Sequence, residues 1–243
     1  MILKRPHDAC VSTFRTSKLG ELPESCEDVI HFRRQGVAIR IAISDGATTS
    51  SFSAEWADLL TRWFTRRLRP ADREAFLRVV PRLGRLWLST LQGRALPWHA
   101  EAKVREGAFA TLLGVTVAVD RWSAIAVGDT CLFQVRDGAL LSSFPYKSSE
   151  EFLQRPTLAG TNPKMNSLLA ESFQSAEGAL RSGDLIVAAT DGLSQWLLRS
   201  VEQDSQPWHI FMEDADSLAG LCDLERGEHR MRNDDVACAW IRV

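Results

Sequence analysis

The chain has 243 residues, of which 45% are hydrophobic and 25% charged, and its formal net charge is −2. This composition is ordinary for a globular protein, and the length allows one large hydrophobic core. A nearly neutral chain gives no reason to expect nucleic acid or an anionic membrane surface as a partner. No window is long and apolar enough to span a membrane, so we expect no membrane association.

The N-terminus and the cysteines favour a cytoplasmic protein. The first ten residues, MILKRPHDAC, have no apolar run after their basic pair, unlike a signal peptide. The five cysteines are odd in number and form no CxxC pair, which favours buried thiols over a disulfide or zinc framework. They are Cys10, Cys26, Cys131, Cys222 and Cys238.

The first half of the chain predicts three strands followed by three helices. An edge strand is expected within residues 8–20, a loop over 20–25, a strand from 26 to 32, and a hairpin turn at 33–36. Residues 37–44 are almost continuously apolar, which is typical of a strand buried on both faces, and end in Ser44-Asp45-Gly46. Helical spacing of apolar residues follows over 52–68 and 72–91, and a third helix opens at Pro97 and runs to about residue 109. Pro81 is expected to kink or split the second helix.

The second half returns to strands. They are expected at 111–119, 122–127 and 131–136, and Asp137-Gly138 predicts a hairpin into 139–142. Residues 144–179 carry three prolines and few apolar runs, which predicts an irregular surface flap with one short helix. A second buried strand, 185–190, ends in Asp191-Gly192 before a helix at 193–198; a helical region at 208–229 and a terminal strand at 236–243 complete a single domain over 1–243.

Acidic residues stand at the ends of four of these strands. They are Glu27-Asp28, Asp45, Asp191 and Asp234-Asp235. If they meet, their carboxylates need compensating cations. An oxygen-only set suits Mg²⁺ or Mn²⁺, and two such ions would activate a water molecule and clamp a phosphoryl group. The residues by themselves leave open the alternative that these side chains lie far apart on solvated loops.

The motifs also occur in an order that resembles the bacterial-type PP2C (PPM) family of metal-dependent serine/threonine protein phosphatases. The resemblance rests on five ordered motifs: Glu27-Asp28, Ser44-Asp45-Gly46, Gly128-Asp129-Thr130, Thr190-Asp191-Gly192 and Asn233-Asp234-Asp235. Residues 180–193, LRSGDLIVAATDGL, are the closest match, and the resemblance covers essentially the whole chain. It implies an α+β fold, a four-layer α-β-β-α sandwich of two antiparallel sheets.

The resemblance also implies a metal centre. By position, Asp45 would bridge two Mg²⁺ or Mn²⁺ ions, and the carbonyl of Gly46 would bind the second. Asp191 and Asp234 would complete the first, while Glu27-Asp28 would act largely through bound water. These carboxylates would form the catalytic set.

Asp129 matches the position that holds a third ion in bacterial relatives, with a plain turn residue as an equal alternative. The implied activity is hydrolysis of phosphoserine and phosphothreonine in a phosphoprotein substrate through a metal-activated water. A cognate serine/threonine kinase would be a further partner.

The chain departs from the family pattern in two places. Residues 47–49 are Ala-Thr-Thr, so the His that some members use as a general acid is missing. The Arg that binds phosphate in many members lies four residues before the acidic pair, where this chain has Pro23. Arg15 is our first candidate to replace it, with Lys18 and Arg33-Arg34 as the other nearby cations.

Two other functions were weighed. A phosphatase of the haloacid dehalogenase type needs a nucleophilic Asp two residues before the Asp-Gly, where this chain has Ile43 or Ala189, so that mechanism is excluded. A catalytically weak or inactive regulatory protein that binds phosphopeptides is the stronger alternative. The retained carboxylates argue against it, and the missing arginine argues for it.

Overall fold

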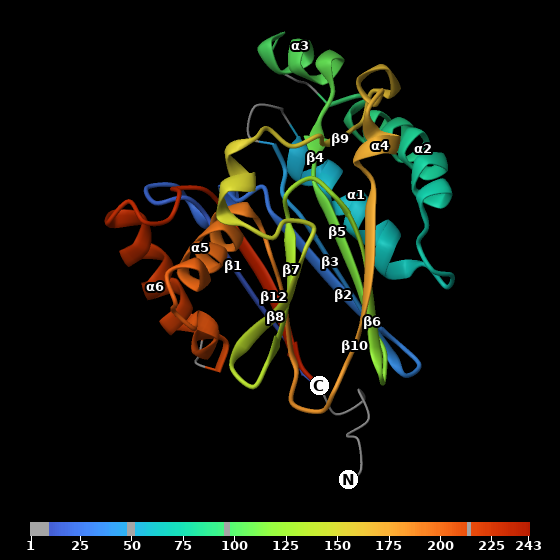
Figure 1. The fold of residues 1–243 in the computed structure, drawn as a ribbon. Coiled ribbons are helices and arrows are strands. Elements are labelled where there is room, and N and C mark those ends of the chain that lie inside the picture. Colours follow the sequence, from blue (N-terminus) through green and yellow to red (C-terminus); the bar gives the residue numbers. More distant parts are fainter. Residues whose placement is uncertain (1–9, 48–51, 95–97, 213–214) are drawn as a thin grey trace.

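Two antiparallel five-stranded sheets pack face to face at the centre of the molecule (Figure 1). The computed structural model describes residues 10–47, 52–94, 98–212 and 215–243. The first sheet contains, in spatial order, β1 (Val11–Thr16), β12 (Val236–Arg242), β11 (Leu185–Ala189), β7 (Cys131–Arg136) and β8 (Ala139–Phe144). The second contains β10 (Gln174–Ala179), β6 (Arg121–Val127), β5 (Leu112–Val117), β3 (Ala38–Ser44) and β2 (Val29–Gln35).

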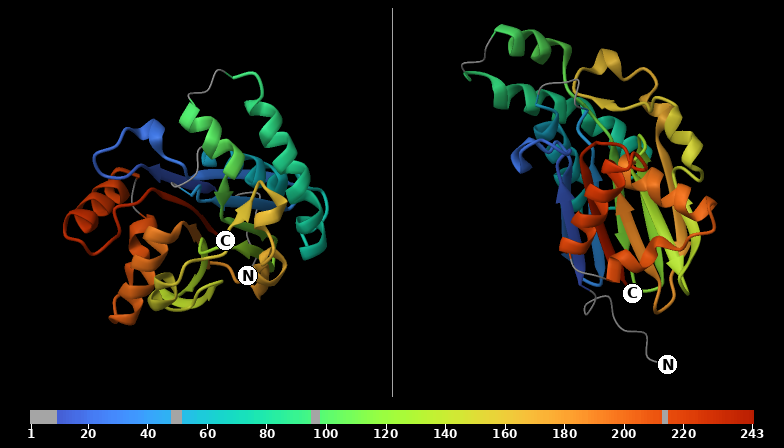
Figure 2. Two further views of the ribbon diagram at one scale, coloured as in Figure 1. Left: turned by 90° about the horizontal axis from the view of Figure 1, so that it is seen from above. Right: turned by 90° about the vertical axis from the view of Figure 1, so that its left-hand side faces the viewer.

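Helices cover both outer faces of the sandwich, as Figure 2 shows. The second sheet carries α1 (Ser53–Arg66) and α2 (Arg73–Leu91), and the first carries α5 (Asp191–Glu202) and α6 (Ala215–Gly227). The remaining elements are α3 (Trp98–Glu106), α4 (Leu169–Ser172), the short strands β4 (Phe109–Ala110) and β9 (Ala159–Gly160), and the 3₁₀ turns η2 (Pro23–Ser25), η3 (Ser149–Leu153), η4 (Pro163–Met165) and η5 (Pro207–Met212). The expected four-layer sandwich is confirmed.

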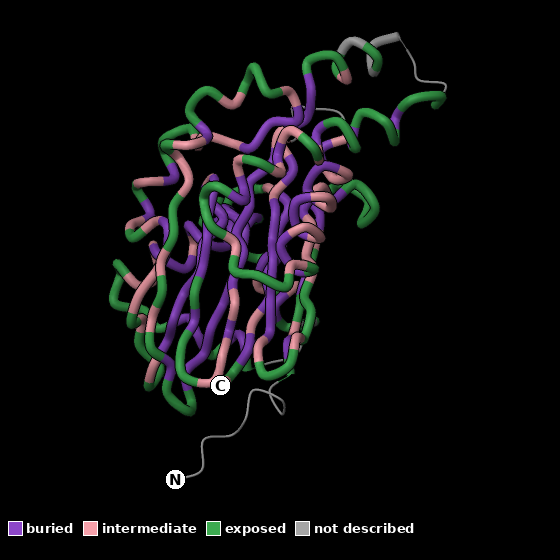
Figure 3. Tube along the Cα trace, turned by 90° about the vertical axis from the view of Figure 1, so that its right-hand side faces the viewer, coloured by how far each residue is buried: buried purple, intermediate pink, exposed green. Residues whose placement is uncertain are grey.

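Three hydrophobic cores separate the four layers. Because side chains alternate along a strand, Ile39 and Ile41 of β3 enter the core between the sheets, while Ala42 faces α1. Helical spacing of four brings Trp56 and Leu60 onto that same outer core. A third core lies between the first sheet and α5, η5 and α6. Buried residues therefore follow the strands, and exposed ones gather in the connections (Figure 3).

The structure differs from the sequence-based expectation at two helices and one turn. The β2–β3 turn centres on Gly36, with φ of 57°, so Arg33-Arg34 belong to β2. The second helix is not split: α2 runs unbroken through Pro81, because its buried face packs on the core on both sides of the proline. Pro97, expected to open the third helix, lies outside the described residues. Helix α5 begins at Asp191, two residues earlier than expected.

Residues 144–179 are more regular than predicted. They contain η3, β9, η4 and α4 and end in β10, which pairs with β6 along its whole length. The sequence of β10, QSAEGA, lacks apolar alternation because an edge strand needs little burial. Gly178 is required there, since a Cβ atom would lie 2.5 Å from Nε1 of Trp122.

All five cysteines are free thiols, and Cys26, Cys131, Cys222 and Cys238 are buried while Cys10 is exposed. Among the described helices, none combines the length and apolar character needed to cross a membrane.

Candidate active site

The acidic motifs meet at one end of the sandwich because of the strand register. Val29 at the start of β2 pairs with Ser44 at the end of β3. In the other sheet, Ala189 at the end of β11 lies between Cys131 and Cys238, near the starts of β7 and β12. The acidic residues that flank these strand ends are thereby brought to the same edge, and the alternative of widely separated carboxylates is wrong.

Asp28 is almost fully buried, and Asp45 is half-buried. Neither oxygen of Asp28 has a hydrogen-bond partner among the described residues. Burial raises the pKa of Asp28 well above its usual value, the nearby hydroxyl of Thr190 partly offsets the rise, and the charges of Asp235, Asp191 and Asp234 raise the pKa further. Burial likewise raises the pKa of Asp45, followed by the charge of Asp28 and of the other cluster carboxylates. Both groups therefore lie where uncompensated negative charge is costly.

Burial and the negative charges of neighbouring carboxylates also raise the pKa values of Asp129 and Asp191. Burial raises the pKa of Asp129 to about 7, with the charge of Asp191 as the next cause. Burial and then the charge of Asp234 raise the pKa of Asp191. We call Asp28, Asp45, Asp129, Asp191 and Asp234 the acidic cluster below. Asp129 lies in the β6–β7 turn, and it belongs to the cluster because the charges of Asp191 and Asp234 raise its pKa.

Main-chain contacts hold Asp45 and Gly46 in place. The Asp45 N–H donates to Oγ1 of Thr111 at 2.8 Å, and the Thr111 N–H donates to the Asp45 carbonyl at 2.9 Å. A Cβ atom on Gly46 would lie 2.9 Å from the carbonyl oxygen of Glu27, so only glycine lets the two segments approach this closely. The side chain of Glu27 accepts a short hydrogen bond from Oγ of Ser53, which ties the acidic pair to the start of α1.

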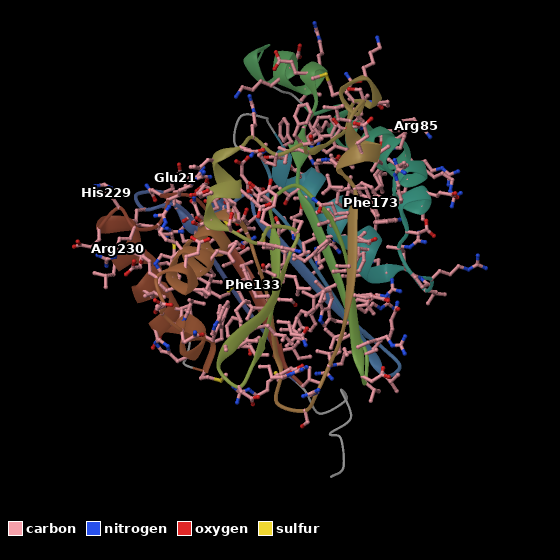
Figure 4. The ribbon with its side chains drawn as sticks, in the orientation of Figure 1. Glu21, Arg85, Phe133, Phe173, His229 and Arg230 are labelled. Atoms are coloured by element: carbon pink, nitrogen blue, oxygen red, sulfur yellow. The ribbon has the colours of Figure 1, made fainter. Side chains whose placement is uncertain are left out.

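Asp234 and Asp235, adjacent in sequence, have different surroundings. The buried carboxylate of Asp235 accepts the N–H groups of Lys18 at 3.1 Å and of Glu27 at 2.8 Å. Asp234 is 40% exposed and pairs with Nζ of Lys18 at 3.1 Å. Asp235 therefore joins the β1–β2 connection to the α6–β12 connection, and Asp234 is the member of the pair that faces the cluster. In Figure 4, Glu21 of the first connection and His229 and Arg230 of the second lie on the same side of the molecule.

We expect Asp235→Ala to destabilise the protein by about 2 kcal/mol, because two backbone donors lose a charged acceptor. Urea denaturation of the metal-free protein measures this loss. Asp234→Ala serves as the control and should cost less, since its side chain is more exposed and accepts one main-chain N–H, that of Asp235 at 2.9 Å, beside the ammonium of Lys18. Equal losses in both variants would contradict the assignment of Asp235 as the structural member.

Among the described residues, four cations contact members of the cluster, and the sequence pointed to two of them, Arg15 and Lys18. Arg15 donates to the main-chain carbonyl of Asp28 at 3.2 Å. It reaches that carbonyl from the other sheet, because β1 pairs with β12 and not with β2. Burial alone would lower the pKa of Lys18, but its hydrogen bond to Asp234 and the nearby carboxylates raise it.

Two further cations, Arg226 and Arg232, were missed. The buried Arg226 donates to the main-chain carbonyl of Asp234 at 2.6 Å. Arg232 lies with its Nη1 3.0 Å from Oδ2 of Asp191. The one feature that could have pointed to it is its place two residues before Asp234, in a loop expected to enter the site. Arg33-Arg34, by contrast, lie in the middle of β2, away from its cluster end.

The cluster is not a ready-made metal site. Among the described residues, no three His, Cys, Asp or Glu side chains stand close enough together to hold an ion as they lie. The donor set nevertheless fits a hard divalent cation, because its members are oxygen ligands and Asp28 offers two buried oxygens without partners. Binding of an ion would therefore require the carboxylates to move toward one another.

Comparison with known protein families identifies the family of this chain. The model of the family described as protein phosphatase 2C matches residues 23–226, which is more than half of the chain. The chain belongs to the protein phosphatase 2C family. The resemblance inferred from the ordered motifs is thereby confirmed.

Solved PP2C structures share the fold at low identity. The serine/threonine phosphatase Stp1 from Staphylococcus aureus is 13% identical, with a TM-score of 0.65, over 96% of this chain and 94% of that one. The catalytic domain of the phosphatase PstP, solved with two manganese ions, is 16% identical, with a TM-score of 0.57, over 96% and 97% of the chains. PppA, described as a key regulatory component of T6SS in Pseudomonas aeruginosa, is 17% identical, with a TM-score of 0.58, over 96% and 97%. No curated protein matches the sequence.

Proposed function

We propose that this PP2C protein is a Mg²⁺- or Mn²⁺-dependent phosphatase that hydrolyses phosphoserine and phosphothreonine in proteins. The observation that carries the proposal is the burial of Asp28 and Asp45 at the meeting point of the strand ends, where both pKa values are raised and Asp28 has no hydrogen-bond partner among the described residues. A fold does not keep several buried carboxylates together without compensation unless they serve a cationic ligand or a reaction.

We assign the ligands from the family pattern and from the placement of the residues. Asp45, the carbonyl of Gly46, Asp191 and Asp234 would hold two ions, with Glu27-Asp28 acting through water. Bound divalent ions supply the positive charge that activates water and neutralises phosphoryl oxygens. Support comes from the manganese ions in the PstP structure, a protein of the same family.

Asp129 would hold a third ion. Its carboxyl lies in the field of Asp191, and burial raises its pKa to about 7, which a cation would reverse. At a turn without function, a carboxylate placed beside other carboxylates would only destabilise the fold.

The chain's own residues position this set. Thr111 and the close approach at Gly46 fix the end of β3, and Asp235 fixes the acidic pair relative to Asp234. Residue 47 is Ala, so no histidine there protonates the leaving oxygen. We further propose one domain over 1–243, a cytoplasmic location, a phosphoprotein substrate with a cognate kinase, and no nucleic-acid or membrane partner.

Hydrolysis of p-nitrophenyl phosphate tests the proposal. Turnover should require Mn²⁺ or Mg²⁺ and vanish in EDTA, because the carboxylates alone repel the phosphate dianion. Restored activity on adding back Mn²⁺ is the control for damage by the chelator. Full activity in EDTA, or no turnover with any divalent ion, would overturn the assignment.

A regulatory protein without significant turnover is the second candidate. Two observations favour it: Pro23 replaces the phosphate-binding arginine, and Arg232 already pairs with Asp191. A PP2C-fold relative in the structural comparison, PppA, is described as a regulatory component. Binding of a phosphopeptide with no release of phosphate would identify this function.

A further inference from the structure

The connection between α6 and β12 places a guanidinium at the acidic cluster. Arg232 Nη1 donates to Oδ2 of Asp191 at 3.0 Å, and Nη2 donates to the carbonyl oxygen of Phe152 in η3 at 2.8 Å. Burial raises the pKa of Asp191 and of Asp129, and the positive charge of Arg232 partly offsets the rise in both. The guanidinium is therefore close to two carboxylates of the cluster.

Two bonds at opposite terminal nitrogens fix the plane of this guanidinium. The side chain is still 42% exposed, so it stands at the mouth of the cluster and not within it. A guanidinium carries five N–H donors in a rigid fork that matches the oxygens of a phosphate group. With one N–H of each terminal nitrogen engaged, further donors remain to meet a ligand that enters from solvent.

We propose that Arg232 orients the phosphate group of the substrate, in place of the arginine whose position Pro23 occupies. The inference rests on the proposed phosphatase function and names a residue that the family pattern does not supply. The ligand class is a phosphate monoester dianion. Such a ligand enters a site lined by carboxylates, and a fixed cation at the mouth offsets their repulsion and sets the direction of the ester bond.

The other cations at the cluster are less suited to this task. Arg226 is buried, and its terminal nitrogens donate to the main-chain carbonyls of Ser17 and Asp234. The ammonium of Lys18 is held by Asp234 at 3.1 Å, and its side chain is only 16% exposed. It also lacks the planar fork of a guanidinium. Arg15 donates to a main-chain carbonyl at the acidic pair, so it supports the start of β2 and pairs with no carboxylate of the cluster in the described structure. Arg15 remains the rival to be measured.

Calorimetric titration of inorganic phosphate into the Mn²⁺-loaded protein tests Arg232 directly. Arg232→Gln should bind phosphate roughly tenfold to a hundredfold more weakly, the effect of losing charge-assisted hydrogen bonds. Arg232→Lys should recover only part of that affinity, because an ammonium keeps the charge but loses the fork. In Arg232→Gln, Mn²⁺ affinity without phosphate should stay equal or rise, since one positive charge leaves Asp191.

Arg230→Gln is the matched control. Arg230 lies two residues away in the same connection, but its guanidinium binds Glu225 at 2.8 Å. Its phosphate and Mn²⁺ affinities should equal those of the unmodified protein. Arg15→Gln measures the rival, and we expect less than a threefold loss of phosphate affinity there.

Three results would overturn the proposal. They are unchanged phosphate affinity in Arg232→Gln, a joint loss of phosphate and Mn²⁺ affinity that marks a merely structural role, and a full loss in Arg15→Gln alone. The phosphatase assignment fails separately, if the unmodified protein shows no turnover of p-nitrophenyl phosphate. Binding of inorganic phosphate by calorimetry still decides the role of Arg232 in that case.

Discussion

Asp45→Asn should lower the turnover of p-nitrophenyl phosphate by about three orders of magnitude or more. The amide keeps the shape of the side chain but removes the negative charge that a bridging ligand contributes, so water activation is lost with the ions. Asp191→Asn should have a comparable effect, because its carboxyl faces the same cluster. The measurement is kcat with saturating Mn²⁺, together with the Mn²⁺ affinity of each variant.

Asp137→Asn is the matched control for these variants. Asp137 lies in the β7–β8 hairpin, at the opposite end of β7 from the cluster, with φ of 53°. Asn tolerates that conformation as well as Asp does, so kcat and stability should stay unchanged.

The stability of Asp45→Asn separates an effect on catalysis from an effect on folding. Metal-free Asp45→Asn should be as stable as the unmodified protein or a few degrees more stable, because a buried, repelled charge is gone. A large loss of kcat accompanied by unfolding would contradict this explanation.

The metal-free protein should become less stable as the pH rises from about 5 to about 8, and saturating Mn²⁺ should reverse the loss. Burial raises the pKa of Asp129 to about 7, and the pKa values of Asp28, Asp45 and Asp191 are raised as well. The native state therefore binds more protons than the unfolded chain between the ordinary carboxyl pKa and about 7. Its stability is fully present at low pH and falls through that window.

Carboxyls whose pKa values are lowered in the folded protein affect its stability over a different pH range. Hydrogen bonds and charges of Arg62 and His31 lower the pKa of Asp58 against the effect of burial, and Arg136 does the same for Asp184. Their contribution is lost only as the pH falls below the ordinary carboxyl range, so the contribution of these two carboxyls stays constant between pH 5 and 8.

Urea denaturation in EDTA at several pH values measures this slope. Mn²⁺ at about 100 times its Kd adds about 2.7 kcal/mol per bound ion, and two ions together shift Tm by roughly 10–20 °C. Asp129→Asn should flatten part of the pH dependence, and the loss of one ion from the titrated stoichiometry would identify Asp129 as a ligand. A metal-free protein whose stability rises from pH 5 to 8 would contradict the raised pKa values.

The sequence alone predicted most elements, because local patterns encode burial, and the family resemblance of its ordered motifs predicted the fold class. The almost continuously apolar runs at 37–44 and 185–190 are typical of buried strands, and both are buried as β3 and β11. Asp137-Gly138 fixed a hairpin through its backbone preferences. Ordered motifs, each tied to a strand end, pointed to the protein phosphatase 2C family. Strand β10 was missed because an edge strand of small polar residues has no such pattern.

Tertiary structure decided which charges meet. Asp234 and Asp235 are indistinguishable as neighbours in the sequence, yet only the pairing of the connections gives Asp235 two backbone donors and leaves Asp234 facing the cluster. Arg15 reaches the acidic pair from the opposite sheet, and Arg232 reaches Asp191 across 41 positions of the chain. Electrostatic contacts depend on distance in space, and residues far apart in sequence carry no local pattern that records it.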